Sequence, residues 1–264
     1  MLIREERFRR ITEWINRENS LSVNELSERL QVSIMTIWRD LQHLEKLGVI
    51  QRVRGGAIKR MPMIDFEPQY ESKRKLHNQQ KQDIARYAAR RFVEEGEIII
   101  FEGGTTVASM VKCLDQPNLT ILTNALDVLV RASNLMPRYN VMCSGGMLRE
   151  KSRTMVGPQA ETFFANFHAN KFFLGATGIN PTDGVTDPNP LEIQVKRAMH
   201  NCAEQTILLL DSSKFGLRSL APIIPLQEID VLVTDACAPK PMLDELAALG
   251  MQIHVTQEPD QARP

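Results

Sequence analysis

The sequence has few cysteines, no clustered histidines and no long apolar run. Its four cysteines and five histidines are scattered along 264 residues, without the close spacing of a disulfide framework or a metal site. Charged residues interrupt the N-terminus where a signal peptide needs an apolar core, and no apolar stretch is long enough to span a bilayer. We therefore expect a cytoplasmic protein with no membrane partner, no metal and no cofactor.

A net charge is also missing, because 32 basic residues balance 32 acidic ones. The balance conceals an asymmetry: residues 1–60 contain 12 lysines and arginines against 8 acidic residues, so the remainder is net acidic. A basic N-terminal end is a candidate nucleic-acid-binding module. The length favours a small domain joined to a larger one.

Three short helices are predicted within the first fifty residues. Apolar residues keep a helical period from Ile3 to Arg17. Ser22 and Glu25 have the spacing of a capping box that opens a second helix, and Ser33 can cap a third. Two caps at this spacing predict a helix-turn-helix over about residues 20–39.

The third helix has an apolar and a polar face. Ile34, Ile37, Leu41 and Leu44 share one side and are expected to face the core. The opposite side is polar and basic, as contacts with base edges and phosphates in a major groove require. The candidate DNA-binding residues of this helix are Ser33, Met35, Thr36, Trp38, Arg39, Gln42 and His43.

A β-hairpin is predicted directly after the third helix. Residues 49–54 alternate apolar and polar side chains, and Gly55 and Gly56 allow a turn. Arg52 and Arg54 would then lie beside the third helix, where they could contact phosphates or enter a minor groove. These four residues complete the candidate DNA-binding set.

Several segments of this module carry a family resemblance: Val32-Ser33, Thr36-Ile37-Trp38-Arg39-Asp40-Leu41, Leu44-Glu45 and Arg54-Gly55-Gly56-Ala57. They resemble the DeoR-type winged helix-turn-helix over nearly all of the first sixty residues. Trp38 departs from the family pattern, which usually has arginine there. The alternative for this module is a three-helix scaffold with a hairpin that serves protein contacts.

The rest of the chain is predicted to be a linker and an α/β domain. The expected layout is a DNA-binding domain at 1–58, a linker at 59–77, an effector-sensing domain at 78–255 and a tail at 256–264. Helical segments alternate with short apolar strands, which implies a mainly parallel sheet covered by helices on both faces. The expected strands are 97–101, 119–122, 140–143, 171–174, 206–210, 231–233 and 252–255.

Small polar residues and glycines follow these strands, where ligands bind to parallel sheets. The run from Glu102 to Thr106 follows an apolar strand and opens a helix, an arrangement that favours an anion and phosphate above all. A tight turn without a ligand is the alternative. Lys214 follows a later strand and places an ammonium group at the same rim.

Five segments of this domain resemble the DeoR-family sensor domain. In order along the chain, they are the G-T-T loop, a T-N pair, an S-G-G segment, the stretch from Gly178 to Glu192 and the D-S-S-K-F-G element. The resemblance implies a fold similar to ribose-5-phosphate isomerase and glucosamine-6-phosphate deaminase, and a phosphorylated sugar or sugar-like effector. Glu102 stands where the family commonly has aspartate. The candidate effector-binding residues are Glu102, Gly103, Gly104, Thr105, Thr106, Thr123, Asn124, Gly145, Gly146, Asp183, Glu192 and Lys214.

Together these features predict a sequence-specific transcriptional regulator, a repressor of a carbohydrate operon that binds double-stranded DNA as a dimer or tetramer. Two alternatives remain. One is a sugar-phosphate isomerase-like or deaminase-like enzyme with Glu102, Asp183, Glu192 and Lys214 as its acid-base set. The other is a constitutive DNA-binding protein with an oligomerisation domain. Arg39 and the basic hairpin disfavour the enzyme, which has no use for them.

Overall fold

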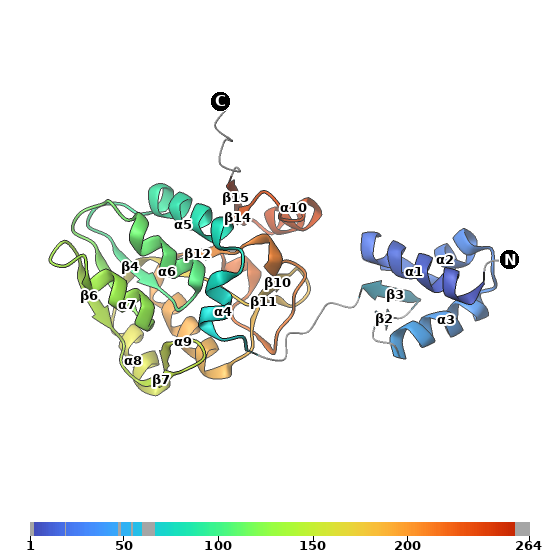
Figure 1. The fold of residues 1–264 in the computed structure, drawn as a ribbon, viewed down its shortest axis with the longest axis horizontal. Coiled ribbons are helices and arrows are strands. Elements are labelled where there is room, and N and C mark those ends of the chain that lie inside the picture. Colours follow the sequence, from blue (N-terminus) through green and yellow to red (C-terminus); the bar gives the residue numbers. More distant parts are fainter. Residues whose placement is uncertain (1–2, 19, 47–48, 54, 60–66, 257–264) are drawn as a thin grey trace, which may run out of the picture. The chain divides into compact units, whose positions relative to one another are not determined.

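The computed structural model describes residues 3–18, 20–46, 49–53, 55–59 and 67–256. The chain divides into two compact units, Met1–Pro62 and Met63–Pro264 (Figure 1). Each unit has an apolar core of its own, which is the property of a separate domain. No helix in the described ranges is long and apolar enough to cross a membrane.

The N-terminal unit consists of three helices and a small antiparallel sheet. Its elements are α1 (Arg4–Glu18), β1 (Ser20–Ser22), α2 (Val23–Leu30), α3 (Ile34–Lys46), β2 (Ile50–Val53) and β3 (Gly56–Lys59). The strands pair in the order β1-β3-β2. The three predicted helices and the hairpin are present, whereas β1 was not predicted, because three residues are too few to show a period.

Both predicted caps of the helix-turn-helix are present. Ser22 accepts a hydrogen bond from the amide of Glu25, whose side chain in turn accepts from the Ser22 amide, which is the complete capping box. Gln31 ends α2 in the left-handed conformation. Ser33 Oγ then accepts from the amide of Thr36 at 3.3 Å and caps α3.

The core of the N-terminal unit collects one apolar stripe from each helix. Ile11, Leu26, Ile37 and Leu41 are fully buried within it. The prediction that Ile34 faces this core was wrong, since its side chain is 46% exposed. Ile34 is the first residue of α3, so the buried stripe of that helix begins one turn later.

The C-terminal unit begins with helices and continues with alternating strands and helices. Its helices are α4 (Tyr70–Lys75), α5 (Asn78–Phe92), α6 (Thr105–Met110), α7 (Leu126–Ser133), α8 (Pro158–Ala165), α9 (Pro190–Asn201) and α10 (Lys240–Ala248). Short 3-10 helices span Val111–Cys113, Ser212–Lys214 and Leu226–Glu228. Its strands are β4 (Ile98–Phe101), β5 (Thr120–Thr123), β6 (Asn140–Cys143), β7 (Met147–Arg149), β8 (Thr154–Val156), β9 (Ala169–Leu174), β10 (Gly178–Asn180), β11 (Gly184–Asp187), β12 (Ala203–Leu209), β13 (Ala221–Pro222), β14 (Val231–Asp235) and β15 (Gln252–Thr256).

A seven-stranded parallel sheet forms the centre of this unit, with the order β15-β14-β12-β9-β4-β5-β6. All seven strands predicted from the sequence belong to it. Helices α5, α6 and α7 pack on one face, and α8, α9 and α10 on the other. The strand order reverses direction between β4 and β9, and such a switch point opens a crevice at the carboxyl ends of the two strands.

The segment from Glu67 to Lys75 belongs to the C-terminal unit, although its sequence suggested part of a linker. Tyr70 is 3% exposed, and its amide donates to the carbonyl of Lys151 at 2.8 Å. Glu67 forms an ion pair with Arg149. The sequence pattern missed this packing because α4 is only six residues long and too short to display a helical period.

A buried ion pair joins α1 to α3 in the N-terminal unit. Arg7 Nε lies 2.7 Å from Asp40 Oδ2, and Arg7 Nη2 lies 3.1 Å from Oδ1. Both residues are buried. Removing one partner leaves the other charge in a poorly solvated position, which is strongly destabilising.

We expect Asp40→Ala to lower the free energy of unfolding of the N-terminal unit by about 3 kcal/mol. Urea denaturation followed by tryptophan fluorescence measures this unit alone, because Trp14 and Trp38 are the two tryptophans of the chain. Glu13→Ala is the control, since it removes an exposed ion pair with Arg9 and should change little. Equal midpoints for both variants would contradict the prediction.

Candidate functional site

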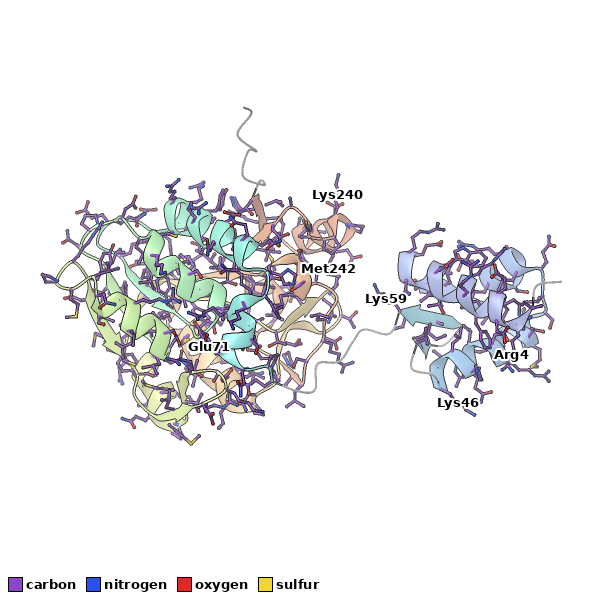
Figure 2. The ribbon with its side chains drawn as sticks, in the orientation of Figure 1. Arg4, Lys46, Lys59, Glu71, Lys240 and Met242 are labelled. Carbon is purple, nitrogen blue, oxygen red and sulfur yellow. The ribbon has the colours of Figure 1, made fainter. Side chains whose placement is uncertain are left out.

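The outer face of α3 presents a polar surface to solvent. Ser33, Met35, Arg39 and Gln42 are exposed, and Thr36 is half-buried with its hydroxyl 3.0 Å from that of Ser33. Lys46 projects from the end of the helix (Figure 2). The predicted polar face is therefore present, and within the described residues Arg39 forms no hydrogen bond or ion pair.

Other candidates of this surface have partners inside the unit. Trp38 is half-buried and packs against the core. The ring of His43 stacks on Phe8, with 5.0 Å between the centroids. Arg52 Nε lies 2.6 Å from Glu45 Oε2.

The hairpin turn also has a structural role. A Cβ on Gly56 would lie 2.2 Å from the carbonyl oxygen of Leu21, so this glycine lets β3 approach β1. Gly55 has a φ of +91°, which favours glycine at the turn. Arg54 lies outside the described residues.

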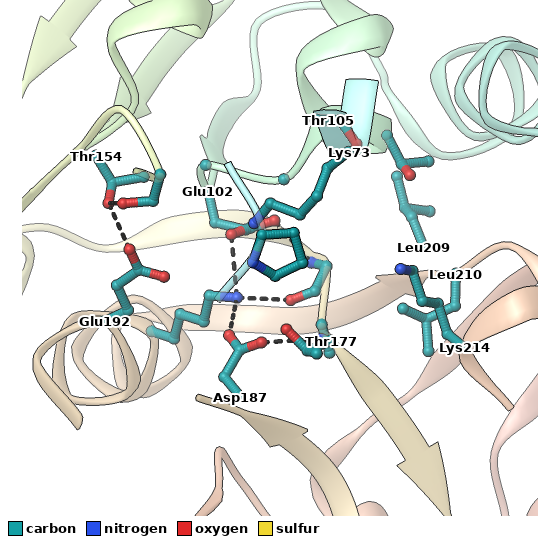
Figure 3. Close-up of a pocket in the computed structure, with 18 of the residues that line it drawn as sticks. Lys73, Glu102, Thr105, Thr154, Thr177, Asp187, Glu192, Leu209, Leu210 and Lys214 are labelled. Carbon is teal, nitrogen blue, oxygen red and sulfur yellow. Dashed lines mark hydrogen bonds and ion pairs between the residues drawn. The ribbon is translucent and has the colours of Figure 1, made fainter. Parts of the chain in front are cut away.

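A polar cavity of about 90 Å³ lies at the carboxyl ends of β4, β9 and β12 in the C-terminal unit. Eight predicted effector residues line it: Glu102, Gly103, Gly104, Thr105, Thr106, Asn124, Glu192 and Lys214. The cavity includes the switch point between β4 and β9. Figure 3 shows these side chains converging from separate elements.

Lys196 of α9 is the central charged residue of this cavity, and sequence reasoning missed it. Its ammonium lies 2.5 Å from Asp187 Oδ2 and 3.2 Å from Glu102 Oε2, and it donates to the carbonyl of Gly175 at 2.7 Å. Burial alone would lower the pKa of Lys196, but the carboxylates of Asp187 and Glu102 outweigh it and raise the pKa. No local pattern in the sequence singles out one lysine of an amphipathic helix.

Two glycines at the strand ends make room for Glu102. A Cβ on Gly104 would lie 2.2 Å from Glu102 Oε1, and one on Gly175 would lie 2.7 Å from the same atom. The amide of Gly175 donates to this oxygen at 3.0 Å. Burial raises the pKa of Glu102, which Lys196 opposes. Gly104 thus makes room for a buried carboxylate, and it also lines the cavity.

A second group of ion pairs, centred on Arg149, lies at another side of the cavity. Glu192 accepts from Thr154 Oγ1 at 3.0 Å and is ion-paired with Arg149. Arg149 also binds Glu67, with 2.5 Å between Nη2 and Oε2 and 3.0 Å between Nη1 and Oε1. Asn124 Oδ1 is buried and has no hydrogen-bond partner in the described part of the chain.

Three lysines besides Lys196 also line the cavity: Lys73, Lys81 and Lys214. Lys73 and Lys214 have no hydrogen bond or ion pair of their side chains with any described residue. Burial, opposed by Asp211 and reinforced by Lys214 and Lys73, lowers the pKa of Lys81 to about 8. Asp211 also lines the cavity and offsets part of their positive charge.

Four predicted effector residues lie outside this cavity lining. The hydroxyl of Thr123 donates to the carbonyl of Phe101 at 2.7 Å and so joins the ends of β5 and β4. Gly145 and Gly146 both have positive φ and form the turn between β6 and β7. Asp183 belongs to the β10-β11 turn and lies 3.4 Å from Arg218. Thr123 is the last residue of β5, whereas the other three lie in turns that do not line the cavity.

A basic winged helix-turn-helix, followed by an α/β unit with a buried polar cavity, defines a transcriptional regulator of the helix-turn-helix type. Residues 7–60 match the DeoR-like helix-turn-helix domain, and residues 76–236 match the DeoR C-terminal sensor domain. The chain therefore belongs to the DeoR family of transcriptional regulators.

Relatives match over most of their length. The chain is 35% identical over 231 residues to the uncharacterised HTH-type transcriptional regulator YulB of Bacillus subtilis, covering 88% of each chain. It is 32% identical over 233 residues to the lactose phosphotransferase system repressor of Streptococcus mutans, covering 88% of this chain and 92% of the relative. Ribose 5-phosphate isomerase from Plasmodium falciparum is similar with a TM-score of 0.37 and 13% identity, over 51% of this chain and 52% of the isomerase.

We expect Lys196→Met to lower the free energy of unfolding of the C-terminal unit by about 3 kcal/mol, because it leaves Glu102 and Asp187 buried without their cation. Lys214→Met is the matched control: it removes an ammonium from the same cavity without breaking an ion pair and should leave stability unchanged. Differential scanning calorimetry measures both. A Lys196→Met variant as stable as the control would refute the structural role.

Proposed function

We propose that the protein is a repressor of a carbohydrate-metabolism operon, and that a phosphorylated sugar or sugar-like effector bound in the cavity controls its affinity for operator DNA. The observation that carries the proposal is that Lys73, Lys81 and Lys214 line the same cavity as the buried side chain of Asn124. The name of the Streptococcus mutans relative, a repressor of a lactose system, supports the carbohydrate assignment.

The cavity offers different partners to the two halves of a sugar phosphate. Lys73, Lys81 and Lys214 supply ammonium groups that attract a dianion. Asn124 Oδ1, buried without a partner among the described residues, is an acceptor for a hydroxyl group. An unpaired buried acceptor is costly, so a ligand hydroxyl there would be favourable. This feature supports a sensing domain over one that only oligomerises.

The exposed residues of α3 support a DNA-reading role for the N-terminal unit. Arg39 is the principal candidate for a base contact, since it is exposed and has no partner among the described residues. Ser33, Met35, Thr36 and Gln42 would surround it. Arg52 would reach a phosphate only by leaving Glu45.

Self-association and a cytoplasmic location complete the proposal. A single winged helix-turn-helix gains specificity for a palindromic operator by pairing, so we propose at least a dimer. The scattered thiols are all free, which suits a reducing compartment.

We also propose that the protein binds its effector without chemical turnover. Glu102 is held by Lys196 and the Gly175 amide, and Glu192 by Thr154 and Arg149. Both carboxylates are thus engaged by partners within the fold, which favours a structural role for them. Asp183, the third member of the candidate acid-base set, does not line the cavity.

For the DNA surface, we expect Arg39→Ala to weaken binding to a selected genomic site by about 1–3 kcal/mol. Arg86→Ala is the control, because Arg86 belongs to the C-terminal unit. Fluorescence anisotropy with the selected site and with random DNA measures both variants. Equal losses on the two DNAs would assign Arg39 to a phosphate instead of a base.

For the cavity, we expect a thermal-shift screen of phosphorylated sugars to find a compound that stabilises the protein, by about 2.7 kcal/mol at a hundredfold excess over its Kd. The same compound should change operator affinity and remain chemically unaltered. Lys214→Met should weaken the response, while Lys112→Met, an exposed lysine outside the cavity, should preserve it. The absence of any active sugar phosphate, or turnover of one, would reject the proposal.

A further inference from the structure

Lys81 of α5 is a buried cation with an incomplete set of partners. It is 3% exposed, and its ammonium donates to the carbonyls of Lys73 at 2.6 Å and Leu76 at 2.7 Å. These carbonyls lie at the C-terminal end of α4, where helices leave acceptors unpaired. An ammonium carries three donors, and the third has no partner among the described residues. Because Lys81 lines the cavity, this donor is available to a bound group.

Two more lysines reach the same cavity from other elements. Lys73 belongs to α4, and Lys214 to the 3-10 helix after β12. Figure 3 shows Lys73 and Lys214 entering the cavity from different sides, with Lys73 extending from near Thr105 toward Glu102. Asp211 is the carboxylate that offsets these charges near Lys81. An anion placed among the three ammonium groups would relieve their mutual repulsion.

The segment Glu67–Leu76 forms a wall of the cavity and also leads to the DNA-binding unit. Glu67, Pro68 and Lys73 line the cavity, and only residues 60–66 separate the segment from Lys59 at the end of β3. It is held to the rest of the C-terminal unit by the Arg149 ion pair, the Tyr70 amide and Lys81. The cavity volume of about 90 Å³ equals roughly three water molecules, enough for a phosphate group.

We propose that Lys73, Lys81 and Lys214 form one anion subsite, and that an anion bound there bridges Lys73 of the Glu67–Leu76 segment to the body of the unit. Occupancy of the cavity then tightens the segment through which the chain continues to the DNA-binding unit. This inference rests on the proposed function and adds to it the residues that bind the phosphate group and the element that responds.

The test uses the full-length protein and inorganic phosphate as the probe. Hydrogen exchange measured by mass spectrometry should show slower exchange of the amides of residues 67–76 as phosphate is added. Lys73→Met and Lys81→Met should each weaken phosphate binding about tenfold or more, as the loss of a hydrogen bond between charged groups predicts. They should also abolish the added protection.

Lys75→Met is the matched control, because Lys75 is on the same helix, is exposed and does not line the cavity. Equal losses for Lys75→Met and Lys73→Met would show only general attraction of anions to a basic helix and would overturn the inference. Since Lys81→Met also removes two hydrogen bonds to α4, Lys73→Met, which breaks none, decides the result if Lys81→Met disorders the segment.

A second measurement separates this inference from the proposed function. If a sugar phosphate changes operator affinity in the wild type and changes it equally in Lys73→Met and Lys81→Met, the three-lysine subsite is wrong while the sensing function holds. If no sugar phosphate changes operator affinity in the wild type, the proposed function fails. Loss of the response in both variants but not in Lys75→Met supports the inference.

Discussion

The buried ammonium of Lys196 is the interaction on which the cavity of this regulator depends. It joins α9 to Glu102 after β4, to Asp187 at the end of β11 and to the Gly175 carbonyl after β9. Two buried carboxylates this close repel each other and have lost their hydration, so the cation between them is needed to offset both costs. The lysine therefore fixes the strand ends at the switch point of the sheet and sets the shape of the space beside them.

The same residue types have different roles in different parts of the molecule, depending on what surrounds them. Arg7 and Arg52 are engaged by Asp40 and Glu45 within the N-terminal unit, whereas Arg39 extends from α3 without such a partner in the described part of the chain. In the cavity, Lys196 is neutralised by carboxylates, while Lys73 and Lys214 form no ion pair with any residue that the structure describes. A charge that is already paired stabilises the fold, and an unpaired one is available to DNA or to an anion.

Much of the fold was predictable because its signals are local. The capping box at Ser22 and Glu25 and the cap at Ser33 involve residues three positions apart, and each buried strand of the central sheet is a continuous apolar run. The elements that were missed, such as β1, α4 and the β10-β11-β13 sheet, are short, and β1 and β13 pair with strands far away in the sequence. Of the predicted effector residues, Glu102, Thr105, Asn124 and Lys214 follow strands that meet at the cavity and line it, whereas Gly145 and Asp183 lie in turns that do not line it.

The sequence by itself determined the three N-terminal helices, the seven strands of the central sheet, the basic character of α3 and the family, because caps, apolar periods and motif spacing are properties of neighbouring residues. The tertiary structure alone decided which charges are paired and which remain free. Lys196 meets Glu102 across 94 positions of the chain and Arg149 meets Glu67 across 82. Contacts over such separations depend on how the sheet and its helices pack, and no local pattern encodes them.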